Sequence, residues 1–246
     1  FSSILIVHSF EVTVLANAMF AWCPLVSSLL LTEAPFKRME ASRPIGNLKR
    51  VVAHLFYEDR MLRLICLNII FFSLATFYVV WLLQPYWRDQ GIPLGMFGIL
   101  WAAQSFLFAV ACKLCIPLEE KFGAVPVLLV MGVLPVVGYF AMAALGGIVG
   151  IMFCATFFVS RGLNQIILSD ALNSRVPSAY RATANSMTSF AFRGIYIITG
   201  PVVGLLIDWQ GMYFALSAIG VVCTILLGLV LAPLLEEIAQ MRKYPC

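Results

Sequence analysis

Residues 122–160 read FGAVPVLLVMGVLPVVGYFAMAALGGIVGIMFCATFFVS, which is 39 consecutive residues without a charged side chain. A glycine pair, Gly146-Gly147, breaks the stretch near its middle. A helix needs about 20 mostly apolar residues to cross the hydrocarbon core of a bilayer. The stretch is therefore long enough for two membrane-spanning helices joined by a tight turn.

The remainder of the chain has the same apolar character. Of its 246 residues, 62% are hydrophobic and 11% are charged, and the mean hydropathy is +0.96. Because charged residues make up about a quarter of a typical soluble protein, this composition excludes a soluble cytosolic enzyme. The net charge of +4 does not indicate nucleic acid as a partner, because the basic residues do not gather on one solvated face. The expected partner is the lipid bilayer.

Charge-free intervals also predict the other spans. Four more of them, 21 to 27 residues long, lie at 12–32, 64–87, 90–112 and 209–235, and residues 186–207 are interrupted only by Arg193. The seven predicted spans are 12–31, 64–83, 94–116, 124–145, 148–169, 186–207 and 212–233. A membrane β-barrel is excluded, because it would show ten-residue segments of alternating hydrophobicity. The predicted fold class is therefore all-α and integral to the membrane.

The basic residues predict the orientation, because Lys and Arg are retained on the cytoplasmic side. The segment 32–63 carries seven of them, whereas the loops on the opposite side hold only Arg88. The other basic residues flank or lie in every second connection, or lie in the tail: Lys113 and Lys121, Arg175 and Arg181, and Arg242 and Lys243. This alternation predicts a multi-pass protein of the plasma or inner membrane with a cytoplasmic C-terminus. Because the chain starts with Phe1 and shows no signal-peptide pattern, we expect a fragment of a longer protein.

The seven cysteines do not indicate a disulfide framework, because most of them lie in apolar runs where a thiol packs as a small hydrophobe. Cys112 and Cys115 form a C-x-x-C pair, but no strand lies nearby for a redox fold. His8 and His54 are too few and too distant for a zinc site. We therefore expect buried packing for the pair, and neither a metal nor a cofactor.

Polar side chains divide the spans into two kinds, because such groups are retained in a membrane only where they face a cavity or another helix. The fourth and seventh spans are almost purely apolar and are expected to be scaffold helices. The second, third, fifth and sixth carry polar and aromatic residues, in the last three as stripes at helical spacing. The predicted cavity residues are Asn68, Trp101, Gln104, Phe108, Arg161, Asn164, Gln165, Phe190, Arg193 and Tyr196. The alternative for the neutral polar residues is interhelical hydrogen bonding.

Two arginines need more explanation, because an arginine at a helix centre costs about 2.5 to 3.5 kcal/mol on insertion scales. Arg161 lies about ten residues from either end of its predicted span and cannot easily reach the headgroups. Arg193 lies seven residues inside the predicted boundary, so that a snorkelling side chain is the alternative to a functional one. Water, a carboxylate or a solute is expected to compensate these charges.

Seven spans with a 32-residue basic segment after the first resemble the C-terminal half of a major facilitator superfamily transporter, the last seven of its twelve spans. The resemblance implies that residues 1–31 end an N-terminal bundle, with its last span at 12–31. It also implies that 32–63 form the central cytoplasmic loop and 64–246 a six-helix bundle with a short tail. In this family the first, second, fourth and fifth helices of each half line the substrate path, which matches the division between polar and apolar spans.

Three local motifs carry the resemblance further. Glu120, Lys121 and Gly123 match the centre of the family's loop signature, although Ile116 stands where a glycine is expected and Ala124-Val125 where two basic residues are expected. Residues 161–165, RGLNQ, resemble the arginine-bearing signature of the fourth helix. Residues 199–204, TGPVVG, resemble the glycine-proline signature of the fifth helix, in which Gly200, Pro201 and Gly204 allow close packing and a bend.

The stretch 170–185 is predicted to be a cytoplasmic loop. Asp170 closes the fifth predicted span, and Arg175 and Arg181 stand within reach of its carboxylate. A salt bridge made in one state and lost in the other would lock a transport gate. The alternative is a solvated loop whose arginines only set the topology.

The leading functional expectation is secondary active transport of a small solute by alternating access, with the other wall of the site in an N-terminal half of the same chain. The sequence contains no G-x-x-x-x-G-K-[ST] motif, so ATP is not expected to drive transport directly. Proton or ion coupling is the default, and since no carboxylate lies in any span, a proton acceptor is expected in the missing half. The two arginines favour an anionic or zwitterionic solute, with a lipophilic drug as the alternative.

Two other functional classes compete with transport. A seven-helix receptor or sensor has the same number of spans, but the short glycine turn and the large first cytoplasmic loop argue against it. An intramembrane enzyme lacks candidates, because no span contains His, Asp or Glu as a base and no G-x-S-x-G occurs. We therefore expect that the chain is not an enzyme.

Overall fold

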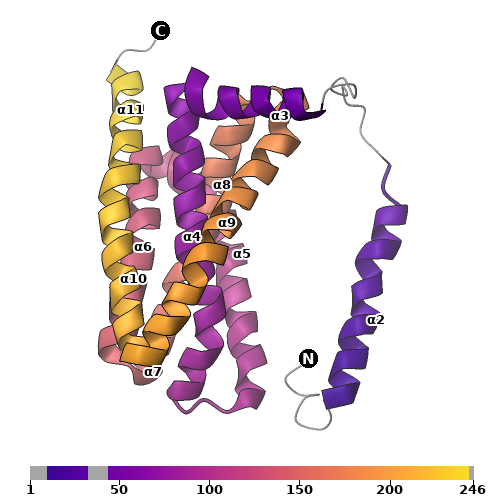
Figure 1. Ribbon diagram of the computed structural model, residues 1–246, viewed down its shortest axis with the longest axis vertical. Helices are drawn as coiled ribbons and strands as arrows, with labels where there is room; N and C mark the ends of the chain where they lie inside the picture. The colour runs from indigo at the N-terminus through magenta and orange to yellow at the C-terminus, as the bar shows by residue number, and fades with distance from the viewer. Residues whose placement is uncertain (1–9, 33–43, 244–246) are drawn as a thin grey trace.

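The computed structural model describes residues 10–32 and 44–243, and every regular element in these two ranges is a helix (Figure 1). Seven helical segments in the same ranges are long and apolar enough to cross a membrane. The predicted fold class, an all-α membrane bundle with one preceding helix, is confirmed. Residues 1–9 and 33–43, with the predicted basic residues Lys37, Arg38 and Arg43, lie outside the described part of the chain.

The elements follow one another in a simple order. They are α2 (Phe10–Leu29), α3 (Pro44–Ala53), the π-helical η1 (His54–Glu58), α4 (Arg60–Asp89), the short 3₁₀-helix η2 (Leu94–Met96), α5 (Phe97–Phe122), α6 (Ala124–Leu145), α7 (Gly147–Phe153), α8 (Ala155–Arg175), α9 (Ser178–Gln210), α10 (Met212–Leu226), the π-helical η3 (Leu227–Leu231) and α11 (Ala232–Lys243).

Several predicted boundaries are wrong, because helices continue past the apolar residues that cross the hydrocarbon. The predicted loop 170–185 is helical except at Val176-Pro177, where Pro177 ends α8 and precedes α9. The charged residues of this region continue the helices, since a helix that leaves the membrane can expose them to water. The connection between α8 and α9 is therefore short.

The predicted glycine turn is present between α6 and α7. Gly146 and Gly147 have φ angles of 56° and 52°, values that cost little only for glycine. After this turn α7 and α8 form one span, Gly147–Arg175, with a local break at Cys154. The two helices of the long apolar stretch therefore run antiparallel.

The bundle is built around α8, which packs against α4, α5 and α6, while α10 pairs with α6. Large side chains fill this core, and Trp87, Tyr86, Tyr139, Phe72 and Phe157 are fully buried. Figure 1 shows α10 and α11 in one column beside α6 at one side of the bundle. In contrast, α9 is the least buried span, and only Ala184 and Thr188 of its residues are buried. Of the predicted packing residues, Pro201 lies inside α9 without ending it, and Gly204 meets open space.

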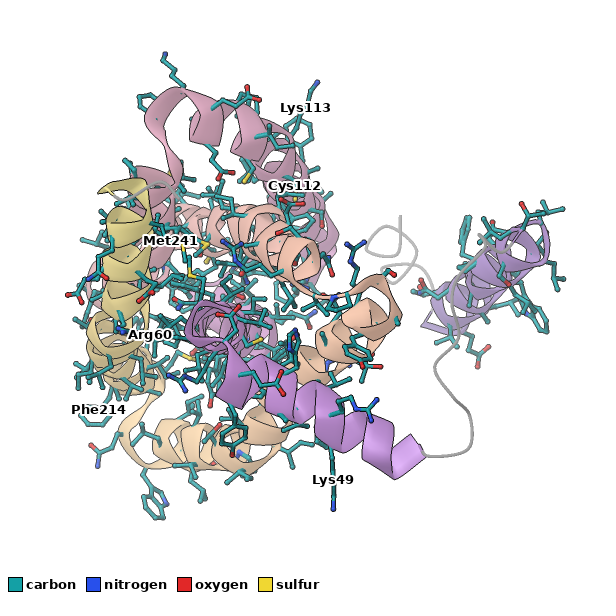
Figure 2. All side chains as sticks on the ribbon, turned by 90° about the horizontal axis from the view of Figure 1, so that it is seen from above. Lys49, Arg60, Cys112, Lys113, Phe214 and Met241 are labelled. Carbon is teal, nitrogen blue, oxygen red and sulfur yellow. The ribbon has the colours of Figure 1, made fainter. Side chains whose placement is uncertain are left out.

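The predicted cytoplasmic segment 32–63 is partly helical. In Figure 1, α3 and η1 lie across the end of the bundle that we call the α3 end, where α4 begins and α11 ends. Val51 and Leu55 are fully buried against the bundle, and Figure 2 shows the side chain of Lys49 pointing away from it. An ion pair between Arg60 Nε and Glu237 Oε2 (3.1 Å) ties the start of α4 to α11. In Figure 1, α2 stands apart from the bundle.

A glycine substitution tests the packing of α8 on α5. A β-carbon at Gly162 would lie 2.7 Å from Ala111 Cβ and 2.8 Å from the carbonyl oxygen of Phe108, so the two helices would have to move apart. We expect Gly162→Ala to lower the free energy of unfolding by about 1–3 kcal/mol, measured as a lower thermal midpoint in detergent. Gly228→Ala is the control, because nothing lies within 4 Å of its β-carbon. Equal midpoints for both variants would contradict this packing.

Candidate functional site

A polar cavity of about 320 Å³ lies between α4, α8 and α9. Only Ile69, Phe77 and Phe192 among its lining residues are apolar. The polar lining residues are Ser73 and Thr76 from α4, Arg161, Asn164, Gln165 and Ser169 from α8, and Asn185, Thr188, Ser189 and Arg193 from α9. Among the described residues, two cationic groups and no carboxylate line this cavity. Polar surface of this kind is expensive in a membrane unless it contacts water or a bound solute.

The cavity brings together the polar residues that the sequence predicted on the fifth span. Arg161, Asn164 and Gln165 are three and four residues apart and share one face of α8. The opposite faces of the same turns pack into the bundle, where Leu163 and Ile167 are buried. The sequence of α8 therefore separates a cavity face from a packing face within a single turn.

The cavity face of α9 is rotated by about one residue from the predicted stripe. It contains Asn185, Thr188 and Phe192 beside the predicted Ser189 and Arg193, whereas Phe190 is 80% exposed on another face. Asn185, Thr188 and Phe192 also recur at intervals of three and four residues, so the sequence pattern could have placed them on the same face. Asn185 lies outside the predicted span 186–207, whereas Thr188 and Phe192 lie within it, one residue before the predicted Ser189 and Arg193.

Both arginines lie at the centres of their spans. Arg161 is the central residue of the span Gly147–Arg175, and Arg193 is next to the central residue of Ser178–Gln210. Arg193 was predicted seven residues inside its span, and it lies fifteen residues from the start of α9 at Ser178. A snorkelling side chain stays the alternative for Arg193, and an arginine surrounded by hydrocarbon at a helix centre costs about 2.5 to 3.5 kcal/mol.

Aromatic rings are the nearest compensation for the two guanidinium groups. The Cζ atom of Arg161 lies 5.9 Å from the centroid of Phe108, and that of Arg193 lies 5.7 Å from the centroid of Phe192. Such cation–π contacts contribute about 0.5–2 kcal/mol each. The structure records two ion pairs among residues 10–32 and 44–243, and neither involves Arg161 or Arg193. The N–H groups of both arginines thus remain available for a ligand.

Asn164 adds an unsatisfied acceptor to the same face. Its side chain is 7% exposed and lines the cavity, and its Oδ1 atom has no hydrogen-bond partner among the described residues. Toward the α3 end, Asn185 Nδ2 donates to Asn173 Oδ1 (2.8 Å) and joins α9 to α8. A buried amide oxygen without a partner is costly, so a bound donor would stabilise it.

Three predicted cavity residues lie in the helix packing instead. Asn68 is fully buried, and its Nδ2 donates to the carbonyl oxygens of Leu64 (2.8 Å) and Val230 (2.9 Å), which ties α4 to η3. Trp101 makes edge contacts with other rings, with centroids 5.8 Å from Trp87. Gln104 is 5% exposed and does not line the cavity. Of the predicted α5 stripe, only Phe108 approaches the site, beneath Arg161.

Tyr196 belongs to an aromatic cluster that adjoins the cavity. Its ring centroid lies 4.8 Å from that of Phe77 and 6.5 Å from that of Trp81. Phe77 is shared between the cluster and the cavity lining. Beside the cluster, the hydroxyl groups of Tyr78 and Thr199 are hydrogen-bonded across α4 and α9. The predicted Tyr196 is therefore a neighbour of the cavity and not part of its lining.

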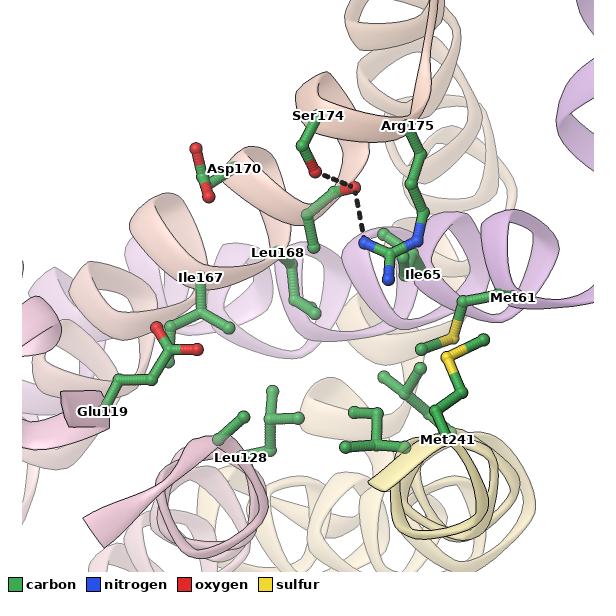
Figure 3. A pocket seen from close by; sticks show the side chains of 14 residues that line it. Met61, Ile65, Glu119, Leu128, Ile167, Leu168, Asp170, Ser174, Arg175 and Met241 are labelled. Carbon is green, nitrogen blue, oxygen red and sulfur yellow. Dashed lines mark hydrogen bonds between the residues drawn. The ribbon is translucent and has the colours of Figure 1, made fainter. Parts of the chain in front are cut away.

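The predicted gate residues lie at the α3 end. Figure 3 shows a second pocket, of about 270 Å³, which Glu119, Asp170 and Arg175 line together with apolar residues of α4, α6, α8 and α11. Arg175 Nη1 and Ser174 Oγ both donate to the carbonyl oxygen of Ala171, at 3.4 and 3.1 Å. Arg175 therefore bonds to its own helix in this conformation.

The predicted salt bridge of Asp170 is absent from this conformation, since neither ion pair recorded between described residues includes it. Arg181 Nε instead donates to the carbonyl oxygen of Val176 (3.2 Å). Of the loop signature, Glu120 and Lys121 are exposed at the end of α5, and Gly123 makes the turn to α6 with a φ angle of 85°.

The C-x-x-C pair packs between helices. Cys112 Sγ and Cys115 Sγ donate to the carbonyl oxygens of Gly162 (3.5 Å) and Leu163 (3.8 Å) on α8. Within the part of the chain that the structure describes, no group of three His, Cys, Asp or Glu residues could hold a metal ion. The packing interpretation of the two cysteines fits this geometry.

The chain is similar in sequence to a known membrane transporter. The chain is 28% identical over 176 residues to an uncharacterized MFS-type transporter of Salmonella typhimurium, where MFS denotes the major facilitator superfamily. The predicted resemblance to this superfamily is confirmed. The alignment covers 68% of this chain and 41% of that transporter. No family model matches the chain, and no solved structure matches it. The chain is thus similar to an MFS-type transporter, and its described residues contain seven helices long and apolar enough to cross a membrane.

Water access to the cavity can be tested with engineered thiols. With Cys23 and Cys246 replaced by serine, a cysteine at Gln165 should react with a charged methanethiosulfonate at least about tenfold faster than one at Val137, because the reactive thiolate forms only in water. Val137 is the control, since it is exposed on the outer face of α6, away from the cavity. Equal rates in membrane vesicles would show that the cavity face lies against lipid.

Proposed function

We propose that this chain is the C-terminal half of a secondary transporter that moves a small solute by alternating access. The observation that carries the proposal is the polar cavity between α4, α8 and α9, with two unpaired guanidinium groups at the centres of apolar spans. The similarity to an MFS-type transporter supports transport at the level of the family. The solute path is the physical reason to retain these charges.

The cavity has walls from three helices of this chain, and α9 leaves most of its length exposed. Because the chain spans 41% of the transporter it resembles, a second bundle is the natural source of the opposite wall. In this proposal the N-terminal half covers the exposed faces of α9 and α5. The α3 end then lies in the cytoplasm, with the positive residues of the sequence on that side.

Hydrogen bonds at the other end of the bundle support movement as a rigid unit. Gln90 Nε2 donates to the hydroxyl group of Tyr213 (2.9 Å), and Gln90 Oε1 accepts from the backbone N–H of Gly147. Tyr86 donates to the carbonyl oxygen of Met142 (3.0 Å). These bonds join α4, α6, α7 and α10, so the bundle is suited to rock against a partner around a fixed site.

Proton or ion coupling remains part of the proposal. Because no carboxylate lines the cavity in the described chain, a coupling carboxylate would come from the N-terminal half. The competing function, a seven-helix receptor, gains no support from a cavity that holds two uncompensated charges. A receptor also has no need of access from both sides of the membrane.

Access from both sides separates the two functions. In the full-length protein, the cysteine at position 165 should react with an impermeant thiol reagent in right-side-out and in inside-out vesicles, because alternating access opens the site to each side in turn. A transported solute should change the two rates in opposite directions. Reactivity from only one side, in preparations with no solute flux, would contradict transport.

Asp170 provides a separate test of the predicted gate. If its carboxylate pairs with Arg175 or Arg181 in the other conformation, Asp170→Asn should shift the ratio of the two labelling rates at position 165 by about tenfold or less, as expected for a single exposed ion pair. Ser174→Ala at the same helix end serves as the control. An unchanged ratio would leave these arginines with a role in topology alone.

A further inference from the structure

We infer that the transported solute is a small organic anion that also carries hydroxyl groups, such as a hydroxy acid, a sugar acid or a sugar phosphate. This inference rests on the function proposed above and concerns the same cavity. It follows from the charge of the lining, from the geometry of guanidinium groups and from the unsatisfied amide of Asn164.

The charge of the lining selects an anion. Arg161 and Arg193 are the charged groups of the cavity, and no acidic residue lines it. The nearest carboxylate on α8 is Asp170, nine residues along the chain from Arg161, which is about 13 Å along the helix axis. On α9 the acidic residue is Asp208, about 22 Å from Arg193 by the same measure. A cationic solute would therefore meet two like charges without compensation from this bundle.

The arginines favour an oxyanion in particular. A guanidinium group is a planar fork of N–H donors that matches the two oxygens of a carboxylate or a phosphate. The aromatic contacts of Arg161 and Arg193 supply no hydrogen-bond acceptor oxygen, so the N–H donors of both groups can still bind an oxyanion. The rings of Phe108 and Phe192 also hold the side chains in place, which lowers the entropic cost of binding.

The amide of Asn164 is the reason to expect a hydroxyl group on the solute. It lies three residues from Arg161 on the same face of α8, and its buried oxygen lacks a donor. A solute hydroxyl group beside the oxyanion would supply that donor. An ammonium group could also donate, but no carboxylate of this lining would balance its charge. Ser73, Ser189 and Gln165 extend the polar lining for further hydroxyl groups.

The same lining argues against a lipophilic drug. Ile69, Phe77 and Phe192 are its apolar members, and the aromatic cluster around Tyr196 lies beside the cavity. An apolar molecule in this cavity would leave the guanidinium groups and the Asn164 oxygen unsatisfied. A hydroxylated anion satisfies both kinds of group at once.

The test uses the full-length protein in lipid nanodiscs and four probes: D-gluconate, D-glucose 6-phosphate, D-glucose and hexanoate. The first two carry an oxyanion and hydroxyl groups, D-glucose lacks the charge, and hexanoate lacks the hydroxyl groups. We expect at least one of the first two, at saturating concentration, to raise the thermal midpoint by about 5 °C. The other two should leave it unchanged. Comparing gluconate with glucose 6-phosphate distinguishes a carboxylate from a phosphate.

Variants assign the effect to the cavity. Arg161→Gln should weaken binding of the active anion by about tenfold or more, and Arg161→Lys should recover only part of this loss because it keeps the charge without the fork. Asn164→Leu should reduce the preference for gluconate over hexanoate. Lys113→Gln is the matched control, because it also removes one positive charge and Lys113 points outward from α5 (Figure 2).

Failure of the inference and failure of the proposed function give different results. If D-glucose or a lipophilic cation such as tetraphenylphosphonium stabilises the protein equally in wild type and Arg161→Gln, the anion inference is wrong while transport stands. If neither anion changes the midpoint, the inference is also overturned. If an anion binds through Arg161 but position 165 reacts from one side only, the solute class stands and transport is contradicted.

Discussion

The high free energy of a charge in hydrocarbon is the constraint that organises this structure. Arg161 and Arg193 stand at the centres of two apolar spans, and a guanidinium group at that depth is tolerated only where water, a counter-charge or a ligand reaches it. The bundle meets this constraint by directing both groups to one cavity. The apolar packing of α6 and α10 lies on the other side of the bundle.

Helix α8 connects the packing to the site. Its packing face is held at close range by Gly162 against α5 and by a hydrogen bond from Ser160 Oγ to the carbonyl oxygen of Met131 on α6 (2.8 Å). Its cavity face carries Arg161 and Asn164. Because the two faces alternate within one turn, any rotation of α8 would bury the arginine among apolar side chains. Close packing therefore fixes the direction of the functional groups.

The sequence predicted the spans well because their signal is local. Length without charge is sufficient to find a membrane helix, and the turn at Gly146-Gly147 follows from two residues that tolerate a positive φ. The helix ends were harder to predict from the sequence, since a helix that leaves the bilayer continues through charged residues. For this reason Asp170 was placed in a loop, and the start of the helix that carries Arg193 was predicted at residue 186 instead of Ser178.

The site was predicted in part for a similar reason. The stripe on α8 could be read from spacing, because Arg161, Asn164 and Gln165 are three and four residues apart. On α5, spacing grouped Trp101 and Gln104 correctly but could not show that their face turns toward α4 and α8. Asn68 was ambiguous from sequence, because a buried amide can bond a solute or, as here, the carbonyl oxygen of Val230 in a π-helical turn. Tertiary packing decides between these outcomes, and it cannot be derived from the pattern of a single sequence.

An experimental structure of the full-length protein in lipid nanodiscs, determined by electron cryo-microscopy, tests the central claim most directly. The account predicts water or solute density against Arg161 and Arg193, and acyl-chain density against the outer faces of α6 and α10. Acyl-chain density against Arg161, or a guanidinium group sealed into dry helix packing, would contradict it.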